Sequence, residues 1–81
     1  MRRRTMVTDF REALAHVDQV LVEGEATHHG AWRRQPVREH VEHAIAHLNA
    51  WQAGATDEDH LGHASTRLLM ALQLAAGEVV P

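Results

Sequence analysis

The sequence predicts an all-α fold of three helices, in which the second and third helices pair as an antiparallel hairpin. Apolar residues recur at helical spacing in three segments, capping and stop residues flank these segments, and no useful length of chain alternates with a period of two. A chain of 81 residues has room for one domain. We therefore assign residues 1–8 to a disordered basic N-terminus and residues 9–81 to a single helical domain.

The first helix is predicted over residues 9–23. Asp9 is followed three residues later by Glu12, which is a capping-box pattern, and Gly24 is expected to end the helix. Residues 24–35 show no periodicity and are predicted to form a loop. Trp32 lies in this loop and is too large an apolar side chain to remain in water without a role.

The second helix is predicted over residues 36–53, because proline is well tolerated at the first helical position and Pro36 occupies it. The third helix is predicted over residues 56–76. Thr56 and Asp59 resemble a capping box, and Gly77 is the expected stop. The short link between these two helices predicts an antiparallel hairpin.

The last half of the third helix is apolar nearly all the way round, which predicts self-association in so small a chain. The simplest assembly is a homodimer that forms a six-helix bundle, and its expected contacts are Leu68, Leu69, Met70, Leu72 and Leu74. The alternative is a central helix that the other two helices bury by themselves.

Composition excludes several classes of protein. The chain has no cysteine, so disulfides, thiolate metal sites and cysteine nucleophiles are absent. Its net charge of −3 argues against a strongly basic nucleic-acid binder. No continuous apolar run indicates a signal peptide or membrane span, so we expect a cytoplasmic protein. The glycine-rich phosphate-binding patterns and the GxSxG motif are also missing.

Histidine is the unusual component, with eight residues in the chain. His40, His43 and His47 share one side of the second helix, while His60 and His63 flank the third helix together with Arg67. A turn near position 55 would place His47 opposite His63, and His43 opposite Arg67.

These two flanks predict a divalent-metal site inside the hairpin. The expected ligands are His43, His47, Asp59, His60 and His63, with Glu39 and Glu42 as further oxygen donors. Imidazole ligands favour Zn²⁺, Ni²⁺, Fe²⁺ or Mn²⁺ over Mg²⁺. The alternative is that each histidine is an independent surface residue on a helix flank.

The chain also resembles a known family. The residues that carry the resemblance are Ala13-Leu14, Val20-Leu21, Gly24, Gly30, Trp32, His47-Leu48-Asn49-Ala50-Trp51, Gly54 and His60-Leu61-Gly62-His63-Ala64. In this order they are similar to the phage and bacterial dATP/dGTP diphosphohydrolase N-terminal domain family, which is related to MazG-type nucleotide pyrophosphohydrolases. The positions that match it most specifically are Trp32, His47, His60 and His63. Glu39 and Glu42 supply one ExxE of the MazG acidic pattern, but the following ExxD is missing.

The resemblance implies an all-α unit that splits deoxynucleoside triphosphates into monophosphate and pyrophosphate with a divalent metal such as Zn²⁺, Mn²⁺, Ni²⁺ or Mg²⁺. In this hypothesis the catalytic residues are Glu39, Glu42 and Arg67, and the nucleotide contacts Trp32, Arg33, Arg34 and Arg67. A salt bridge from Arg67 to Glu39 or Glu42 is the alternative role of that arginine. The competing hypothesis is a non-catalytic helical dimer, a phage-type binding or regulatory protein that uses its histidines for metal or pH response.

Overall fold

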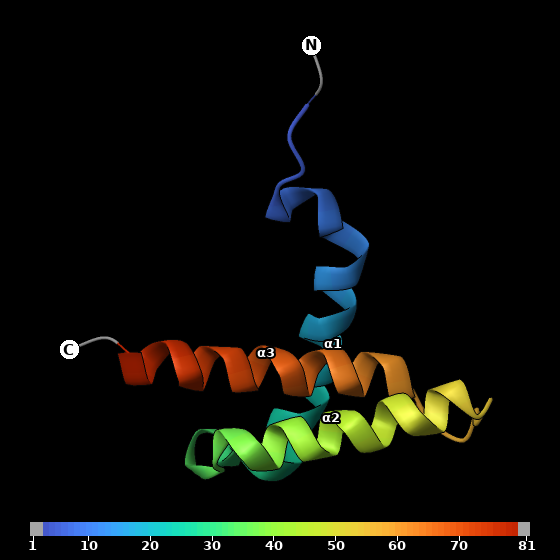
Figure 1. Ribbon diagram of the computed structural model, residues 1–81, viewed down its shortest axis with the longest axis vertical. Helices are drawn as coiled ribbons and strands as arrows, with labels where there is room; N and C mark the ends of the chain where they lie inside the picture. The colour runs from blue at the N-terminus through green and yellow to red at the C-terminus, as the bar shows by residue number, and fades with distance from the viewer. Residues whose placement is uncertain (1–2, 80–81) are drawn as a thin grey trace.

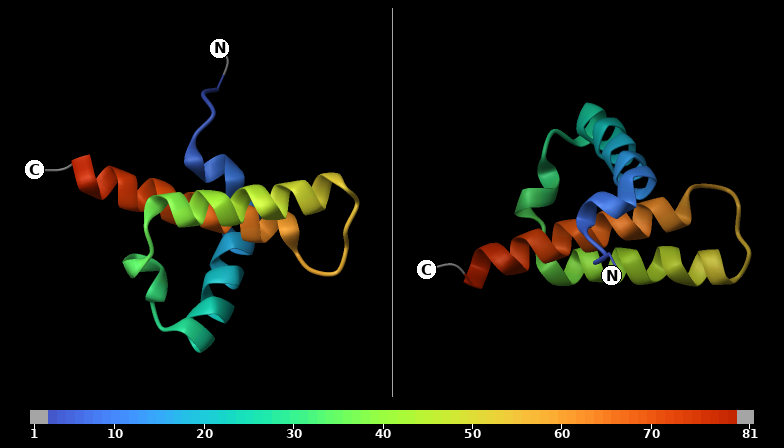
Figure 2. Two further views of the ribbon diagram at one scale, coloured as in Figure 1. Left: turned by 60° about the horizontal axis from the view of Figure 1, so that its bottom comes forward. Right: turned by 90° about the horizontal axis from the view of Figure 1, so that it is seen from above.

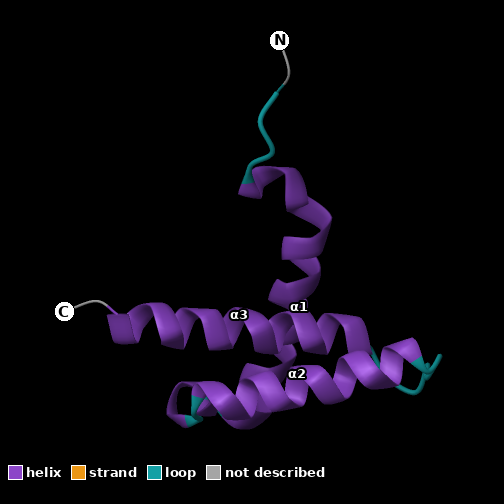
Figure 3. Cartoon of the chain, in the orientation of Figure 1, coloured by secondary structure: helices purple, strands orange, loops and turns teal. Residues whose placement is uncertain are grey.

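A computed structural model of the chain describes residues 3–79, and the part it describes contains helices and loops but no strand (Figure 3). The elements are a 3-10 helix η1 (Val7–Phe10), α1 (Arg11–His28), a second 3-10 helix η2 (Ala31–Arg34), α2 (Val37–Gln52) and α3 (His60–Val79). The predicted all-α class with three main helices is therefore confirmed. Of the predicted basic N-terminus, residues 1–2 lie outside the described residues, and residues 7–8 belong to η1.

Helices α2 and α3 run antiparallel as a hairpin, as the sequence predicted, and α1 crosses this hairpin on the side of α3 (Figure 1). The chain returns from the end of α1 through η2 to the start of α2 (Figure 2). This arrangement brings the end of α1 beside the middle of α3.

Helix α1 is longer than predicted because Gly24 does not end it. A Cβ atom at Gly24 would meet no other atom, and the helix continues to His28. It stops where two successive residues, His29 and Gly30, adopt left-handed backbone conformations with φ of 47° and 72°. The His29 N–H then caps the helix by donating to the Glu25 carbonyl.

Helix α3 begins four residues later than predicted, at His60 instead of position 56. The Asp59 carboxylate accepts the backbone N–H of Gly62 at 3.1 Å, which is how an N-cap residue satisfies a free donor of the first turn. The link between α2 and α3 therefore covers residues 53–59 and is longer than the sequence indicated. At its other end α3 passes Gly77 and reaches Val79.

The interior of the described chain is small. Its buried apolar residues are Ala44, Ala64 and Ala71, and its buried polar residues are His40, His60 and Thr66. The alanines allow α2 and α3 to approach closely, and Thr66 satisfies its hydroxyl by donating to the Gly62 carbonyl at 2.8 Å. Most leucines remain half-buried or exposed. No helix in the described part is both long enough and apolar enough to span a membrane.

Candidate metal centre and groove

Four side chains gather where the hairpin opens into its connecting loop. His47 comes from α2, Glu58 from the loop, and His60 and His63 from the first turn of α3. Their nitrogen and oxygen atoms are close: His47 Nδ1 lies 3.0 Å from His60 Nδ1, and His63 Nδ1 lies 2.9 Å from Glu58 Oε1. His47 Nδ1 lies 3.7 Å from the same Glu58 oxygen. We call these four residues the His47 cluster.

The cap of α3 explains why the cluster forms. Because Asp59 starts the helix, His60 and His63 stand three residues apart on one side of its first turn. The residue just before the cap is Glu58, whose carbonyl accepts the His60 N–H at 3.0 Å. The loop therefore turns the Glu58 side chain back towards the histidines of both helices.

The orientation of the His60 ring is fixed by Asp57. His60 Nε2 lies 2.8 Å from Asp57 Oδ1, and a carboxylate only accepts, so Nε2 carries the hydrogen and Nδ1 presents its lone pair to His47. This hydrogen bond is the main reason that the pKa of Asp57 lies below its ordinary value of 3.8. His47 Nδ1–H then donates to His60, and His63 Nδ1–H donates to Glu58.

Three of the four residues in the His47 cluster offer donor atoms close enough to share one metal ion. With metal–ligand bonds of about 2.0 to 2.1 Å, neighbouring ligand atoms stand about 3.3 Å apart. Three of the six separations between the four donor atoms are 2.9, 3.0 and 3.7 Å. Glu58, His47 and His63 each offer a ligand atom within 4.8 Å of the others, and His60 is the most buried member with 8% of its surface exposed.

The two imidazoles and one carboxylate of His47, His63 and Glu58 form a donor set that suits Zn²⁺ and similar transition metals better than Mg²⁺. His60 belongs to a second such group with Asp57 and Glu58, and as a ligand beside His47 it would have Asp57 as the outer carboxylate that orients it.

Charge and burial favour the neutral form of His47. Its pKa lies below the ordinary value of 6.5, first because the ring is partly removed from water. Glu58 opposes this shift, while His63, His60 and Arg67 add to it. A neutral imidazole has a lone pair available for a metal, so the cluster is suited to bind one near neutral pH.

A groove of about 340 Å³ runs from the His47 cluster along α3, between α1 and the hairpin. Its hairpin wall contains His47, His63, Thr66, Arg67 and Met70, and its α1 wall contains Val20, Leu21, Glu23, Gly24, Thr27 and His28. Two further pockets adjoin this groove, and His28 lines all three spaces. One is a narrow pocket of about 100 Å³ that places Trp32 and Gln35 beside Arg67.

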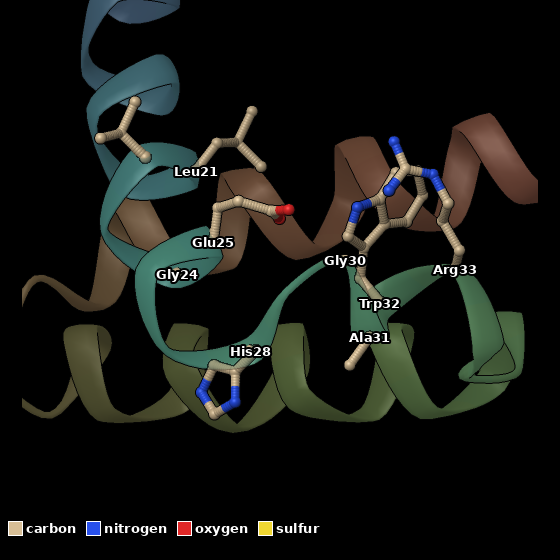
Figure 4. Close-up of a pocket in the computed structure, with 9 residues that line it drawn as sticks. Leu21, Gly24, Glu25, His28, Gly30, Ala31, Trp32 and Arg33 are labelled. Atoms are coloured by element: carbon tan, nitrogen blue, oxygen red, sulfur yellow. The ribbon is translucent and has the colours of Figure 1, made fainter.

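The other adjoining pocket, of about 380 Å³, lies between the end of α1 and η2 (Figure 4). Figure 4 shows the Glu25 carboxylate directed into this space and the Arg33 guanidinium in front of the Trp32 indole. The guanidinium carbon lies 4.8 Å from the centre of the indole ring. Arg33 therefore covers one face of Trp32 by a cation–π contact.

The structure separates the predicted site residues into two groups. It brings His47, His60 and His63 together, and it places Arg67 in the groove that His47 and His63 line. Asp59 instead bonds the imidazole of His16 at 2.5 Å, which with the Gly62 N–H holds the pKa of this carboxyl below 3.8. His43, Glu39 and Glu42 are exposed on α2, and Arg34 is exposed at the end of η2.

Arg67 has partners that the sequence did not indicate. Its Nη1 donates to Gln35 Oε1 at 2.8 Å and to His40 Nδ1 at 3.0 Å. Within residues 3–77 no ion pair joins it to Glu39 or Glu42. Sequence reasoning also missed Glu58 and Asp57, because it placed both inside a helix. The acidic run directly before His60 was the available signal.

The comparisons with known proteins agree with the resemblance seen in the sequence. The family described as dATP/dGTP diphosphohydrolase, N-terminal, matches residues 2–79. This match covers nearly the whole chain, and the chain therefore belongs to that family. No curated protein and no solved structure matches it.

Proposed function

We propose that this member of the dATP/dGTP diphosphohydrolase N-terminal family is a metal-dependent nucleotide hydrolase that holds a deoxynucleoside triphosphate in the groove between α1 and the hairpin. The observation that carries the proposal is that one groove is lined by His47 and His63 of the cluster and also by Arg67. A metal ion bound at His47 and His63, together with the Arg67 guanidinium, would place two positive groups in one groove, which suits a chain of phosphates. The products would be a nucleoside monophosphate and pyrophosphate.

Each part of the groove has a proposed task. The His47 cluster would hold a divalent ion such as Zn²⁺ or Mn²⁺, which when bound supplies Lewis acidity to the phosphate oxygens. Arg67 would neutralise phosphate charge, and the base would lie against the Trp32–Arg33 pair in the adjoining pocket. Glu23 lines the same groove as the cluster, and we propose it as the acid–base group in place of Glu39 and Glu42.

The test is pyrophosphate release from dATP and dGTP in the presence of Zn²⁺, Mn²⁺ or Mg²⁺. We expect turnover by the wild type and a loss of at least about a hundredfold in a His47→Ala, His63→Ala double variant, because the ion would lose two of its ligands. His43→Ala is the matched control: this histidine lies on the same helix but is exposed and outside the cluster. Wild-type protein that binds metal but releases no more pyrophosphate than the double variant would rule out the hydrolase.

A second candidate is a non-catalytic helical dimer that uses the His47 cluster only to bind metal. The dimer is supported by the apolar side chains that the single chain leaves exposed. On α3 these are Leu61, Leu68, Leu69 and Leu72, and on α2 they include Ile45 and Trp51. Self-association fits both candidates, so the pyrophosphate assay is what separates them.

A further inference from the structure

His40 is the largest side chain that the described chain buries completely, with 0% of its surface exposed. It does not belong to the His47 cluster, yet both of its ring nitrogens are bonded. Nε2 lies 2.9 Å from the Trp32 carbonyl oxygen, and Nδ1 lies 3.0 Å from Arg67 Nη1. The buried imidazole therefore joins the η2 segment to an arginine of α3.

The two partners of His40 require a single arrangement of its hydrogen. A carbonyl oxygen only accepts, so Nε2 carries the hydrogen and donates to Trp32. An arginine only donates, so Nδ1 must accept from Arg67. The ring is consequently neutral and fixed in one orientation, and no other partner is needed to satisfy it.

These contacts also determine which part of Arg67 is free. Its Nη1 has two hydrogens, and they go to Gln35 Oε1 at 2.8 Å and to His40 Nδ1 at 3.0 Å. For Nη2 and Nε, no hydrogen bond is found among residues 3–77. Nε and Nη2 form one of the two edges of the planar guanidinium that can bind two oxygens of a phosphate at once, and it is the edge that does not use Nη1.

We propose that His40 and Gln35 are positioning residues that hold Arg67 by Nη1 and present its Nε–Nη2 edge to a phosphate in the groove. The inference rests on the proposed use of the groove as a phosphate site. Arg67 lines both the main groove and the narrow pocket beside Trp32. Its guanidinium therefore lies between the His47 cluster and η2. An arginine that is already held loses less conformational freedom when the anion binds.

The experiment is a calorimetric titration of chelator-treated protein with inorganic pyrophosphate, which needs neither metal nor turnover. Two variants of His40 separate its hydrogen bonds. His40→Gln can keep a donor near the Nε2 position but offers no acceptor at Nδ1, whereas His40→Asn keeps an acceptor near Nδ1 and loses the donor. We expect pyrophosphate affinity to fall about tenfold in His40→Gln, less in His40→Asn, and most in Arg67→Ala.

A double-mutant cycle distinguishes positioning from a general effect on the fold. If His40 acts through Arg67, adding His40→Gln to Arg67→Ala causes no further loss of pyrophosphate affinity. Equal losses from His40→Gln in both backgrounds would overturn the proposal. So would wild-type protein whose pyrophosphate affinity does not depend on Arg67.

A further variant, Gln35→Met, tests the proposal at another position. It removes the other acceptor of Arg67, at a half-buried loop position, and leaves the buried His40 ring unchanged. It should also weaken pyrophosphate binding, and it keeps the proposal testable if a His40 variant fails to fold. Circular dichroism and Zn²⁺ affinity of the His47 cluster check that each variant is intact. Coupled pyrophosphate binding without any hydrolysis of dATP or dGTP would support this inference while rejecting the hydrolase.

Discussion

The histidines of the chain differ in what holds their rings, and this difference decides what each can do. His60 is oriented by the Asp57 carboxylate, so its Nδ1 lone pair points into the cluster. His40 is oriented by the Trp32 carbonyl and has its Nδ1 lone pair occupied by Arg67. Identical side chains on neighbouring helices therefore offer a lone pair to the cluster in one case and an acceptor to an arginine in the other.

At this residue scale we predict that Asp57→Asn weakens Zn²⁺ binding by about 10 to 100-fold, the usual effect of losing a carboxylate that orients a histidine ligand. The amide oxygen is a neutral and therefore weaker acceptor for His60 Nε2–H, so the ring is held less firmly and is less basic. Competition against a chromophoric chelator at pH 7 gives the affinity. Asp18→Asn, an exposed position on α1, is the control. Equal Zn²⁺ affinities in the two variants would mean that Asp57 does not support a metal ligand.

The same titration carried out as a pH series reports on His47. Its pKa in the folded chain is below the ordinary 6.5, mainly through desolvation, so the fold prefers the neutral ring. The unfolded chain then binds more protons as the pH falls below 6.5, and folding stability decreases in that direction. Zn²⁺ affinity should decrease with it, because protons and metal compete for the same lone pairs.

At the scale of elements, the attachment of α1 to the hairpin depends on a close approach at Gly62. Among the described residues, one side-chain hydrogen bond joins α1 to the hairpin, from His16 to Asp59 at 2.5 Å. A Cβ atom at Gly62 would collide with the Asp59 carboxylate and with the His16 ring. The same glycine donates its N–H to the cap of α3. Gly62 therefore contributes both to the N-terminal cap of α3 and to the close contact between α1 and the hairpin.

We therefore predict opposite results for two glycine-to-alanine substitutions. Gly62→Ala should lower the free energy of unfolding by about 1 kcal/mol, because the loss of the Asp59 cap and of the His16–Asp59 contact outweighs the helical preference of alanine. Gly24→Ala should raise it by up to about 1 kcal/mol, because that position is helical and its Cβ would meet nothing. Urea denaturation measures both. A stabilised Gly62→Ala variant would show that α1 does not dock as described.

The arrangement of the helices and loops also shows which features the sequence could predict and which it could not. Helical periodicity and the opposing positions of the two flanks were enough to bring His47, His60 and His63 together. Periodicity carries no information about a loop, so it could not place Glu58 or turn Asp59 towards His16. On α2, His40 lies on the side that packs against α3 and His43 lies on the exposed side, which is why Arg67 bonds His40.

At the scale of the whole molecule, the single chain exposes more surface than its mass accounts for. A folded monomer of 9.1 kDa has an accessible surface of about 4,900 Å², whereas this chain has 6593 Å². Its radius of gyration of 14.2 Å also exceeds the value of about 12 Å for a monomeric domain of this length. An excess of about 1,700 Å² per chain is comparable to what each partner buries in an obligate dimer.

The exposed leucines indicate where a second copy would bind. Leu61, Leu68 and Leu72 follow one another along one side of α3, with Leu72 67% exposed, and no charged residue of α3 itself lies on that side. The predicted contacts Met70 and Leu74 are half-buried, and Met70 lines the groove instead. We therefore expect the leucine side of α3 to form the centre of the interface.

The corresponding prediction is that the wild type is a homodimer and that Leu68→Glu combined with Leu72→Glu converts it into monomer or unfolded chain. Two buried carboxylates would lack partners in the interface, and each costs more than an exposed leucine gains from burial. Sedimentation at several concentrations gives the mass, and circular dichroism separates monomer from unfolded chain. Gln73→Glu adds a charge to the same helix at another exposed position and should leave the dimer intact. A wild-type chain that sediments as a folded monomer at high micromolar concentration would instead require the small alanine-lined interior to stabilise the fold alone.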